Sequence, residues 1–351
     1  MPPALNRTNI RAFPSEGRVN YTSGDGTIFA RKTAMGGIMT STKRIILLAT
    51  ASLAAAFLFN PGFAAPAGTS PISQAYRERG KEAVDFQKVP PVKMFDNLWY
   101  VGPGYVSCYL IKTSAGAILI DASEEPDMVT HVIDSIKKTG TDLKDIKYIL
   151  ISHGHIDHWG GIDRMRELTG APVYATEEDW QMIEQAASRP GRNGAPAPRA
   201  PKRDRVIKDG DTLTLGDTTL KFYKTPGHTP GVMSTEFTVF DNGVPHKAFY
   251  SGGLGGRDGV KGFEQAVQSS ARVAQIQGIE VYLPNHGWNP GTDYPNGSLF
   301  ERFPKLQARK ADDPNPFVDP ASWKQNIAEA QERIKRGLEA ERKKAAAGGA
   351  N

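Results

Sequence analysis

The chain has 351 residues, of which 43 are basic and 38 acidic, and its formal net charge is +5. The first 64 residues hold seven of the basic and two of the acidic residues, so the remainder carries 36 of each sign. This balance removes the electrostatic argument for nucleic-acid binding. About 285 residues suit one large α/β domain. The single cysteine, Cys108, excludes an intrachain disulfide and is expected to be a small buried apolar residue.

A secretory signal is predicted at residues 39–64. Lys43 and Arg44 form its basic region, residues 45–59 form its apolar region, and Gly62-Phe-Ala64 resembles a cleavage site. The apolar region is shorter than the roughly 20 residues that span a bilayer. Removal of the signal is therefore expected rather than anchoring, and the mature protein is expected in the periplasm.

Residues 1–38 do not resemble part of that signal. They are interpreted as an over-long, disordered start, because Met35 or Met39 would be a more sensible first residue. The mature chain then has an N-terminal segment at 65–90 and one domain at 91–351.

Hydrophobic periodicity predicts alternating strands and helices in that domain. Strands are expected at 98–101, 107–113, 116–121, 147–152, 172–175, 205–207, 212–215, 218–224, 233–241, 246–251 and 281–283. Helices are expected at 126–138, 162–169, 176–187, 262–277 and 320–343. Asp319 can cap the last helix and Pro320 fits its first turn. The apolar stripe of this helix favours docking on the domain over binding a partner.

Five of the seven histidines fall in three short motifs. These are His153-Gly-His155-Ile-Asp157-His158, Thr225-Pro-Gly-His228-Thr-Pro-Gly231 and Leu283-Pro-Asn-His286-Gly287. Zinc binds neutral imidazole and carboxylate groups. Alternate residues of an extended segment point the same way, so His153 and His155 can bind one metal. Asp157 and His158 follow where the chain turns toward a helix, and they can face a second metal about 3.5–4 Å away.

The alternative for any single histidine is a structural or surface role. That alternative would suffice for His228 or His286 alone, but four potential ligands in six residues are hard to explain as core or solvated surface. The cluster therefore strengthens the two isolated histidines as ligands. His131 and His246 are interpreted as structural, the first on a helix face and the second in a hairpin turn.

These motifs resemble those of metallo-β-lactamase-fold hydrolases, and most closely those of the subclass B3 metallo-β-lactamases. The similarity runs from about Phe95 to His286 and includes Leu98-Trp-Tyr-Val-Gly102, the HxHxDHxGG segment and the TPGHTPG loop. The resemblance implies an αββα sandwich, in which two mixed sheets pack face to face with helices outside. The metals would lie at the strand edges where the two halves meet.

The subclass depends on the strand before the last histidine. Glyoxalase II and the lactonases carry a metal-bridging Asp there and other β-lactamases carry a Cys, whereas Ala248-Phe-Tyr-Ser-Gly-Gly-Leu254 offers neither. The resemblance then assigns two Zn²⁺ ions per chain. The ligands of the first are His153, His155 and His228, and those of the second are Asp157, His158 and His286.

Two differences from the family lie where substrate is expected. Typical members carry a serine near Gly252 or Gly253, whereas Ser251 is displaced here, and Trp159 stands where a smaller residue is usual. The expected substrate contacts are Ser251, Gly253, Asn285 and Trp159. The Pro- and Gly-rich segment 188–203 is expected to be a surface loop that either borders the site or is a plain excursion.

The resemblance implies hydrolysis of a β-lactam amide by a metal-bound hydroxide, with Asp157 as the catalytic residue. One alternative is a dinuclear zinc hydrolase of another cyclic ester or amide, such as a lactone. A second is a non-catalytic zinc-binding periplasmic protein. The expected partner is a small-molecule substrate, without nucleic acid and without stable membrane association after signal removal.

Overall fold

The structure, a computed structural model, describes residues 71–80, 82–191, 196–287 and 297–348. All of them belong to one compact unit of the chain. The expectations for residues 1–38 and for the signal at 39–64 lie outside the described residues. Within the described ranges, no helix is both long and apolar enough to cross a membrane.

The first sheet has seven strands that follow one another in chain order. They are β1 (Val92–Phe95), β2 (Leu98–Tyr100), β3 (Tyr109–Thr113), β4 (Gly116–Ile120), β5 (Ile146–Leu150), β6 (Val173–Ala175) and β7 (Arg205–Val206). Pairing is antiparallel from β1 to β4 and parallel from β4 to β7. In β4 every residue after Gly116 is buried, as expected for a strand that is covered on both faces.

The second sheet has five strands in the order β12-β11-β10-β9-β8. They are β8 (Thr212–Leu215), β9 (Thr218–Lys224), β10 (Met233–Asp241), β11 (Val244–Ser251) and β12 (Val281–Pro284). β10 and β11 form a hairpin through Asn242 and Gly243, which both have positive φ (50° and 79°). A two-residue turn with positive φ at both positions has a backbone twist that matches the right-handed twist of the paired strands. Only β12 pairs in parallel, alongside β11.

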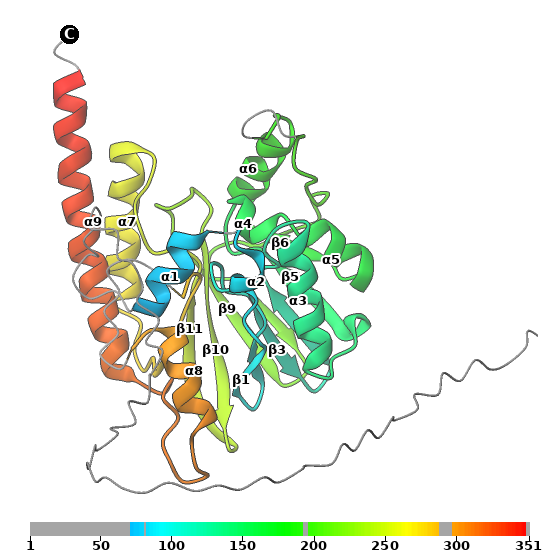
Figure 1. The fold of residues 1–351 in the computed structure, drawn as a ribbon. Coiled ribbons are helices and arrows are strands. Elements are labelled where there is room, and N and C mark those ends of the chain that lie inside the picture. Colours follow the sequence, from blue (N-terminus) through cyan, green and yellow to red (C-terminus); the bar gives the residue numbers. More distant parts are fainter. Residues whose placement is uncertain (1–70, 81, 192–195, 288–296, 349–351) are drawn as a thin grey trace, which may run out of the picture. The chain divides into compact units, whose positions relative to one another are not determined.

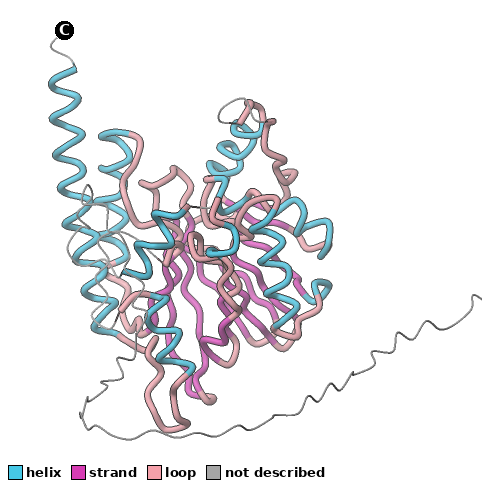
Figure 2. Tube along the Cα trace, viewed as in Figure 1, coloured by secondary structure: helices cyan, strands magenta, loops and turns pink. Residues whose placement is uncertain are grey.

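The two sheets pack face to face, with helices on both outer faces (Figures 1 and 2). A core cluster joins the inner faces through residues such as Tyr109 and Ile120 of the first sheet and Phe222 and Tyr250 of the second. A second cluster packs the first sheet against α3 (Asp127–Lys138), α5 (Ile162–Thr169) and α6 (Glu177–Ala187). A third packs the second sheet against α7 (Gly259–Val273) and α9 (Pro320–Gly348). The predicted αββα sandwich is confirmed.

Every predicted strand and helix is present, with ends shifted by a few residues. The sequence did not reveal β1, a short 3₁₀ turn at Leu143–Asp145, or the helices α1 (Pro71–Arg79), α2 (Val84–Gln87), α4 (Ile156–Trp159) and α8 (Leu299–Gln307). The start of α8 does carry a readable signal, because Ser298 and Glu301 form a capping box. The last helix extends to Gly348 rather than ending at 343.

The residues expected to be structural have the expected burial. Cys108 is a buried free thiol just before β3. His131 is buried on α3, and its Nε2 lies 3.3 Å from the carbonyl oxygen of Gly102. The placement of His246 in a turn is wrong, because the residue lies within β11, where its Nδ1 is 3.4 Å from Glu280. The turn is shorter than expected because Asn242 and Gly243 alone reverse the chain.

Candidate metal centre

The first histidine motif begins directly after β5 and continues into the single turn of α4. His153 and His155 lie on the loop, whereas Asp157 and His158 lie on α4. The glycine between the two histidines leaves room for Met182, since a Cβ on Gly154 would lie 2.9 Å from its Sδ and the methionine side chain would have to shift. The short helix then turns Asp157 and His158 toward a second position.

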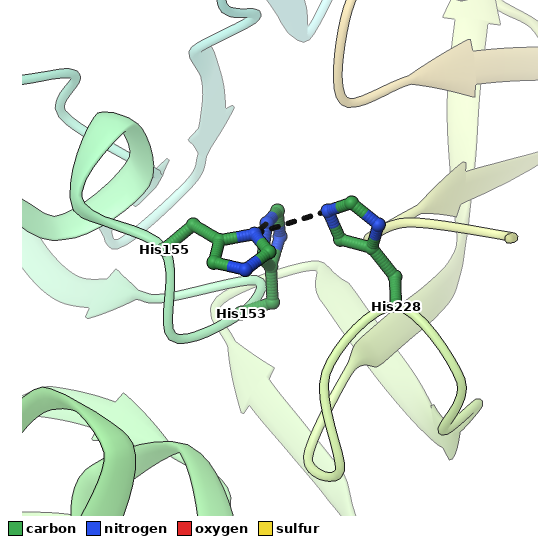
Figure 3. Close-up of side chains that lie close together, drawn as sticks. All are labelled: His153, His155 and His228. Carbon is green, nitrogen blue, oxygen red and sulfur yellow. Dashed lines mark hydrogen bonds between the residues drawn. The ribbon is translucent and has the colours of Figure 1, made fainter. Parts of the chain in front are cut away.

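His153, His155 and His228, called the first trio here, come together from two loops. Nδ1 of His155 lies 3.0 Å from Nε2 of His153 and 3.0 Å from Nε2 of His228. Figure 3 shows the three rings turned toward one another. All three ligand atoms lie within 4.8 Å of one another, which suits one shared metal ion.

Asp157, His158 and His286 form the second trio. Nε2 of His158 lies 3.2 Å from Nε2 of His286, and Oδ2 of Asp157 is 3.6 Å from each. The outer nitrogens face acceptors: Nδ1 of His158 is 2.8 Å from Oδ2 of Asp121, and Nδ1 of His286 is 2.6 Å from the carbonyl oxygen of Tyr105. These acceptors place the ring protons on Nδ1.

With those tautomers, both inner Nε2 atoms of the second trio carry lone pairs. When both rings are neutral, two lone pairs and one carboxylate oxygen converge on one point. A shared cation resolves this arrangement, and an imidazole–carboxylate donor set suits zinc. The residues therefore fit the metal that the sequence motif implies.

Asp121 supports the second trio, and sequence reasoning gave it no role. Its buried carboxylate accepts hydrogen bonds from Ser152 N (2.8 Å), Ser152 Oγ (2.6 Å) and Tyr250 Oη (2.9 Å), besides its contact with His158. The available signal was an acidic residue immediately after an apolar strand, β4. A carboxylate behind a ligating histidine fixes the ring and raises its basicity as a ligand.

Burial sets the protonation of the first trio. It lowers the pKa of His155 to about 4 and, together with the neighbouring His155, that of His228 to about 3. Burial also holds the pKa of His153 well below its usual range. All three rings are thus neutral near pH 7, which is the form that binds metal.

Carboxylates change this pattern in the second trio. Burial lowers the pKa of His158, but the charges of Asp157 and Asp121 outweigh burial and the net shift is upward. Burial raises the pKa of Asp157, but the nearby histidines, His158 first, outweigh it and the net shift is downward. Burial lowers the pKa of His286 to about 4.

Members of both trios line one cavity of about 480 Å³. This volume is typical of small-molecule sites. Of the expected substrate contacts, Gly253 and Asn285 lie in the wall. The other described lining residues are His155, Asp157, His228, Leu254, Gly255, Gly256, Arg257, Phe263, His286, Arg333, Ile334 and Gly337.

The expected substrate contacts of Trp159 and Ser251 are not supported by the structure. Trp159 is fully buried in the core, and its indole N–H donates to the carbonyl oxygen of Gly154 at 3.0 Å. Successive helical residues point about 100° apart, so Trp159 turns away from the side that carries His158. Ser251 is 2% exposed and follows Tyr250 on β11, so it points to the opposite face of the sheet from Tyr250 and is absent from the cavity wall.

The glycine pair beside the site has a steric cause. A Cβ on Gly252 would lie 2.1 Å from the carbonyl oxygen of Met233. Gly253 has φ 144°, and its Cβ would lie 3.3 Å from Cδ2 of His228. A serine at either position would require the backbone or the ligand ring to shift.

The described parts of the loop at 188–203 are paired with the neighbouring helices α5 and α6. Arg203 pairs with Glu177 (2.6 Å) and Glu184 (2.8 Å), and Arg199 pairs with Asp163. Residues 188–191 and 196–203 contribute nothing to the cavity wall. Of the two roles left open by the sequence, these parts fit a surface loop that does not border the site.

The chain is similar to known proteins over the segments that carry these residues. The family model described as the metallo-beta-lactamase superfamily matches residues 101–239, which include five of the six ligand candidates. A solved subclass B3 metallo-β-lactamase of Bradyrhizobium japonicum is 31% identical, and the match covers 75% of this chain and 99% of that one with a TM-score of 0.64.

Two curated relatives match shorter parts. An uncharacterised protein of Aquifex aeolicus is 32% identical over 134 residues, which are 38% of this chain, and this chain spans 60% of its length. A hydroxyacylglutathione hydrolase of Haemophilus influenzae is 27% identical over 190 residues, 52% of this chain and 85% of that protein.

Proposed function

This chain belongs to the metallo-β-lactamase superfamily, and from that premise we propose that it is a dinuclear zinc hydrolase that opens the amide bond of a β-lactam ring. The observation that carries the proposal is the shared cavity, whose wall holds His155 and His228 of the first trio and Asp157 and His286 of the second. One small substrate there can reach both trios. The likeness to a subclass B3 enzyme over nearly all of its length favours the β-lactam.

The first trio would hold one zinc ion and the second trio the other. When bound, the ions supply Lewis-acid polarisation of a carbonyl group and a water that is reactive at neutral pH. The low pKa values of His155 and His228 keep protons from competing for their ligand nitrogens.

The protein's own groups position the reactants. Asp157 remains a carboxylate because its pKa is lowered, so it can accept a hydrogen bond from the attacking water and orient that water toward the carbonyl carbon. Asp121 and the carbonyl oxygen of Tyr105 hold the rings of His158 and His286 in place. Asn285 lies in the cavity wall, and its Nδ2 donates to the carbonyl oxygen of Gly252 at 3.2 Å, which fixes the amide beside the substrate space.

A second candidate is hydrolysis of an ester or thioester, such as a lactone. The similarity to a hydroxyacylglutathione hydrolase favours it. The donor set is evidence against it, because Asp157 is the only carboxylate in the two trios of the described chain, and the lactonases and glyoxalase II carry an additional Asp.

A substrate panel tests the proposal. The zinc-loaded protein is offered a penicillin, a cephalosporin, a carbapenem, a neutral lactone and an acylglutathione thioester, with a chelator-treated sample as control. We expect chelator-sensitive hydrolysis of the β-lactams. Turnover of the lactone or thioester alone would establish the second candidate, and no turnover with two zinc ions bound would leave the non-catalytic role.

We also propose that the protein is exported to the periplasm after cleavage near Ala64. The support is the basic and apolar pattern of residues 43–59. Determination of the N-terminal peptide of the mature protein tests this, and recovery of residues 1–30 would contradict it.

A further inference from the structure

The first trio is carried by two loops that are far apart in the sequence. His153 and His155 lie on the loop after β5, whereas His228 lies on the loop after β9 (Figure 3). Groups that bind one metal ion must be held to within roughly 0.5 Å of their working positions. The separation of the two loops therefore decides whether the three rings converge. One helix outside the trio, α6, contacts both loops.

The start of α6 packs against the loop of His228. Oγ1 of Thr176, the residue before the helix, donates to the carbonyl oxygen of Gly231 at 2.9 Å and accepts from the backbone N–H of Asp179 at 3.3 Å. A Cβ on Gly231 would lie 2.1 Å from Oγ1 of Thr176 and 2.6 Å from Cγ of Asp179. Only a glycine lets the loop approach the helix this closely.

The same face of α6 reaches the loop of His153 and His155. Met182 follows Asp179 by three positions, so the two side chains lie on one face of the helix. A Cβ on Gly154, between the two histidines, would lie 2.9 Å from Sδ of Met182. Neighbouring side chains of α6 thus meet the two loops that carry the first trio.

Asp179 places a carboxyl group between these loops, and its side chain is only 1% exposed. Burial raises the pKa of this group to about 7, against hydrogen bonding from the Thr229 hydroxyl and the backbone N–H groups of Gly154 and Gly231, which lowers it. These contacts are longer or less well aligned than ordinary hydrogen bonds, because neither carboxylate oxygen has a partner of ordinary geometry among the described residues. The donors nevertheless come from both loops, and Thr229 directly follows His228.

We propose that Asp179 is a positioning residue for the first zinc ion, because its carboxylate joins the two loops and so holds His228 opposite the other two histidines. Asp179 belongs to neither trio and is absent from the cavity wall. It would act through the backbone of Gly154 and Gly231 and through the hydroxyl of Thr229. This inference rests on the proposed function, since it takes the first trio to be a zinc site.

Asp179→Asn tests this role, since it keeps the shape of the side chain but replaces one acceptor oxygen by a donor. Loss of a carboxylate that supports a metal ligand weakens metal binding by about 10–100-fold. Asp179 acts through the backbone, so we expect about tenfold weaker zinc at the first trio and unchanged zinc at the second. Competition with a chromogenic chelator measures both dissociation constants. The visible spectrum of the Co²⁺-loaded variant should also differ from that of the wild type, because the ligand geometry of the first ion changes.

Glu177→Gln is the matched control. Glu177 lies in the same first turn of α6, but its side chain is 47% exposed and pairs with Arg203, so its replacement should change neither zinc affinity. Thr229→Val should weaken zinc at the first trio a few-fold, and Thr229→Ser should restore it, because serine keeps the hydroxyl. Combining Thr229→Val with Asp179→Asn should cost less than the product of the two losses, since both variants remove the same contact.

The outcomes separate a positioning role from a structural one. If Asp179 only stabilised the fold, Asp179→Asn would lower the free energy of unfolding of the metal-free protein and leave both zinc affinities and the Co²⁺ spectrum unchanged. That result, or equal weakening at both trios, would overturn the proposal. Should Asp179→Asn fail to fold, a wild-type affinity of the first trio in Thr229→Val would overturn it instead.

The same measurements separate this inference from the proposed function, because zinc binding is read independently of turnover. Weaker zinc at the first trio in these variants, without turnover of any substrate by the wild type, would uphold the positioning role and refute the hydrolase. Hydrolysis by the wild type together with unchanged zinc affinities in the variants would refute the positioning role while the hydrolase stands.

Discussion

The first and second trios open onto the same cavity but are supported differently. In the second trio, Asp121 and the carbonyl oxygen of Tyr105 hold the outer ring nitrogens of His158 and His286. In the first trio, within the described residues, only the outer nitrogen of His153 has a hydrogen-bonding partner, Ser152 Oγ at 3.3 Å. The second trio is therefore positioned by its surroundings, whereas the first depends on its own loops and on neutral, buried rings.

Removal of a ligand gives the largest expected effect. His228→Ala should lose one metal ion per chain and reduce turnover by about 10³-fold or more, because the transition state loses the stabilisation that the ion provides. His286→Ala should do the same at the second trio and retain the ion of the first. Metal analysis beside kinetics measures both.

His246→Ala is the control for these variants, since His246 lies in β11 outside both trios. Full metal content and activity in His228→Ala would show that the first trio is not a metal site.

Asp121→Asn tests the difference in support. Loss of a carboxylate behind a ligating histidine typically weakens metal binding by about 10–100-fold. We expect the larger loss at the second trio, because His158 contacts Asp121 directly. Competition with a chromogenic chelator gives both dissociation constants. Asp134→Asn, an exposed carboxylate on α3, should change neither. Equal weakening at both trios would contradict the proposed difference in support.

The pH dependence of the metal-free protein probes the neutral rings. The pKa values of His155 (about 4), His228 (about 3) and His286 (about 4) lie below the usual value near 6.5. The unfolded chain thus binds more protons between about pH 4 and pH 6.5, so the free energy of unfolding falls as pH falls through this window. Relative to neutral pH, each of these rings lowers the free energy of unfolding at pH 5 by on the order of 1–2 kcal/mol.

Urea denaturation between pH 7.5 and pH 5 checks this expectation. His155→Gln should flatten the pH profile, because it removes one of the titrating rings. A wild-type profile that is flat over the same range would show that these rings are not held neutral in the folded protein.

The smallest expected effect concerns the backbone that packs against His228. Gly253→Ala places a Cβ at φ 144° and 3.3 Å from the ring. We expect the free energy of unfolding to fall by about 1–3 kcal/mol. The metal affinity of the first trio should fall a few-fold, and that of the second trio should stay unchanged. Gly255→Ala is the matched control, since its Cβ would meet nothing within 4 Å. Equal effects of the two substitutions would remove the steric account of the glycine pair.

The sequence was most informative where a few neighbouring residues decide the outcome. The six ligand candidates could be found because they lie in short motifs that follow apolar strands, and the structure brings them together in two trios. The sandwich followed from the family resemblance, since periodicity alone gives only a mixed α/β chain. Trp159 was misplaced because adjacency in sequence does not reveal which side of a one-turn helix a residue occupies.

Other features depend on contacts between distant segments. Asp121 meets His158 from another strand end, and Arg333 reaches the cavity from a helix near the C-terminus. The position of Asp121 after an apolar strand is a weak local signal and Arg333 has none, because tertiary packing determines which groups the two residues meet. The steric cause of the glycine pair was hidden in the same way, since Met233 approaches Gly252 from the neighbouring strand.

The most direct test of the two-trio account is anomalous diffraction from a crystal of the zinc-loaded protein, recorded on both sides of the zinc absorption edge. We predict two peaks, one among His153, His155 and His228 and the other among Asp157, His158 and His286. A single peak shared by both trios, or peaks elsewhere in the molecule, would contradict the account.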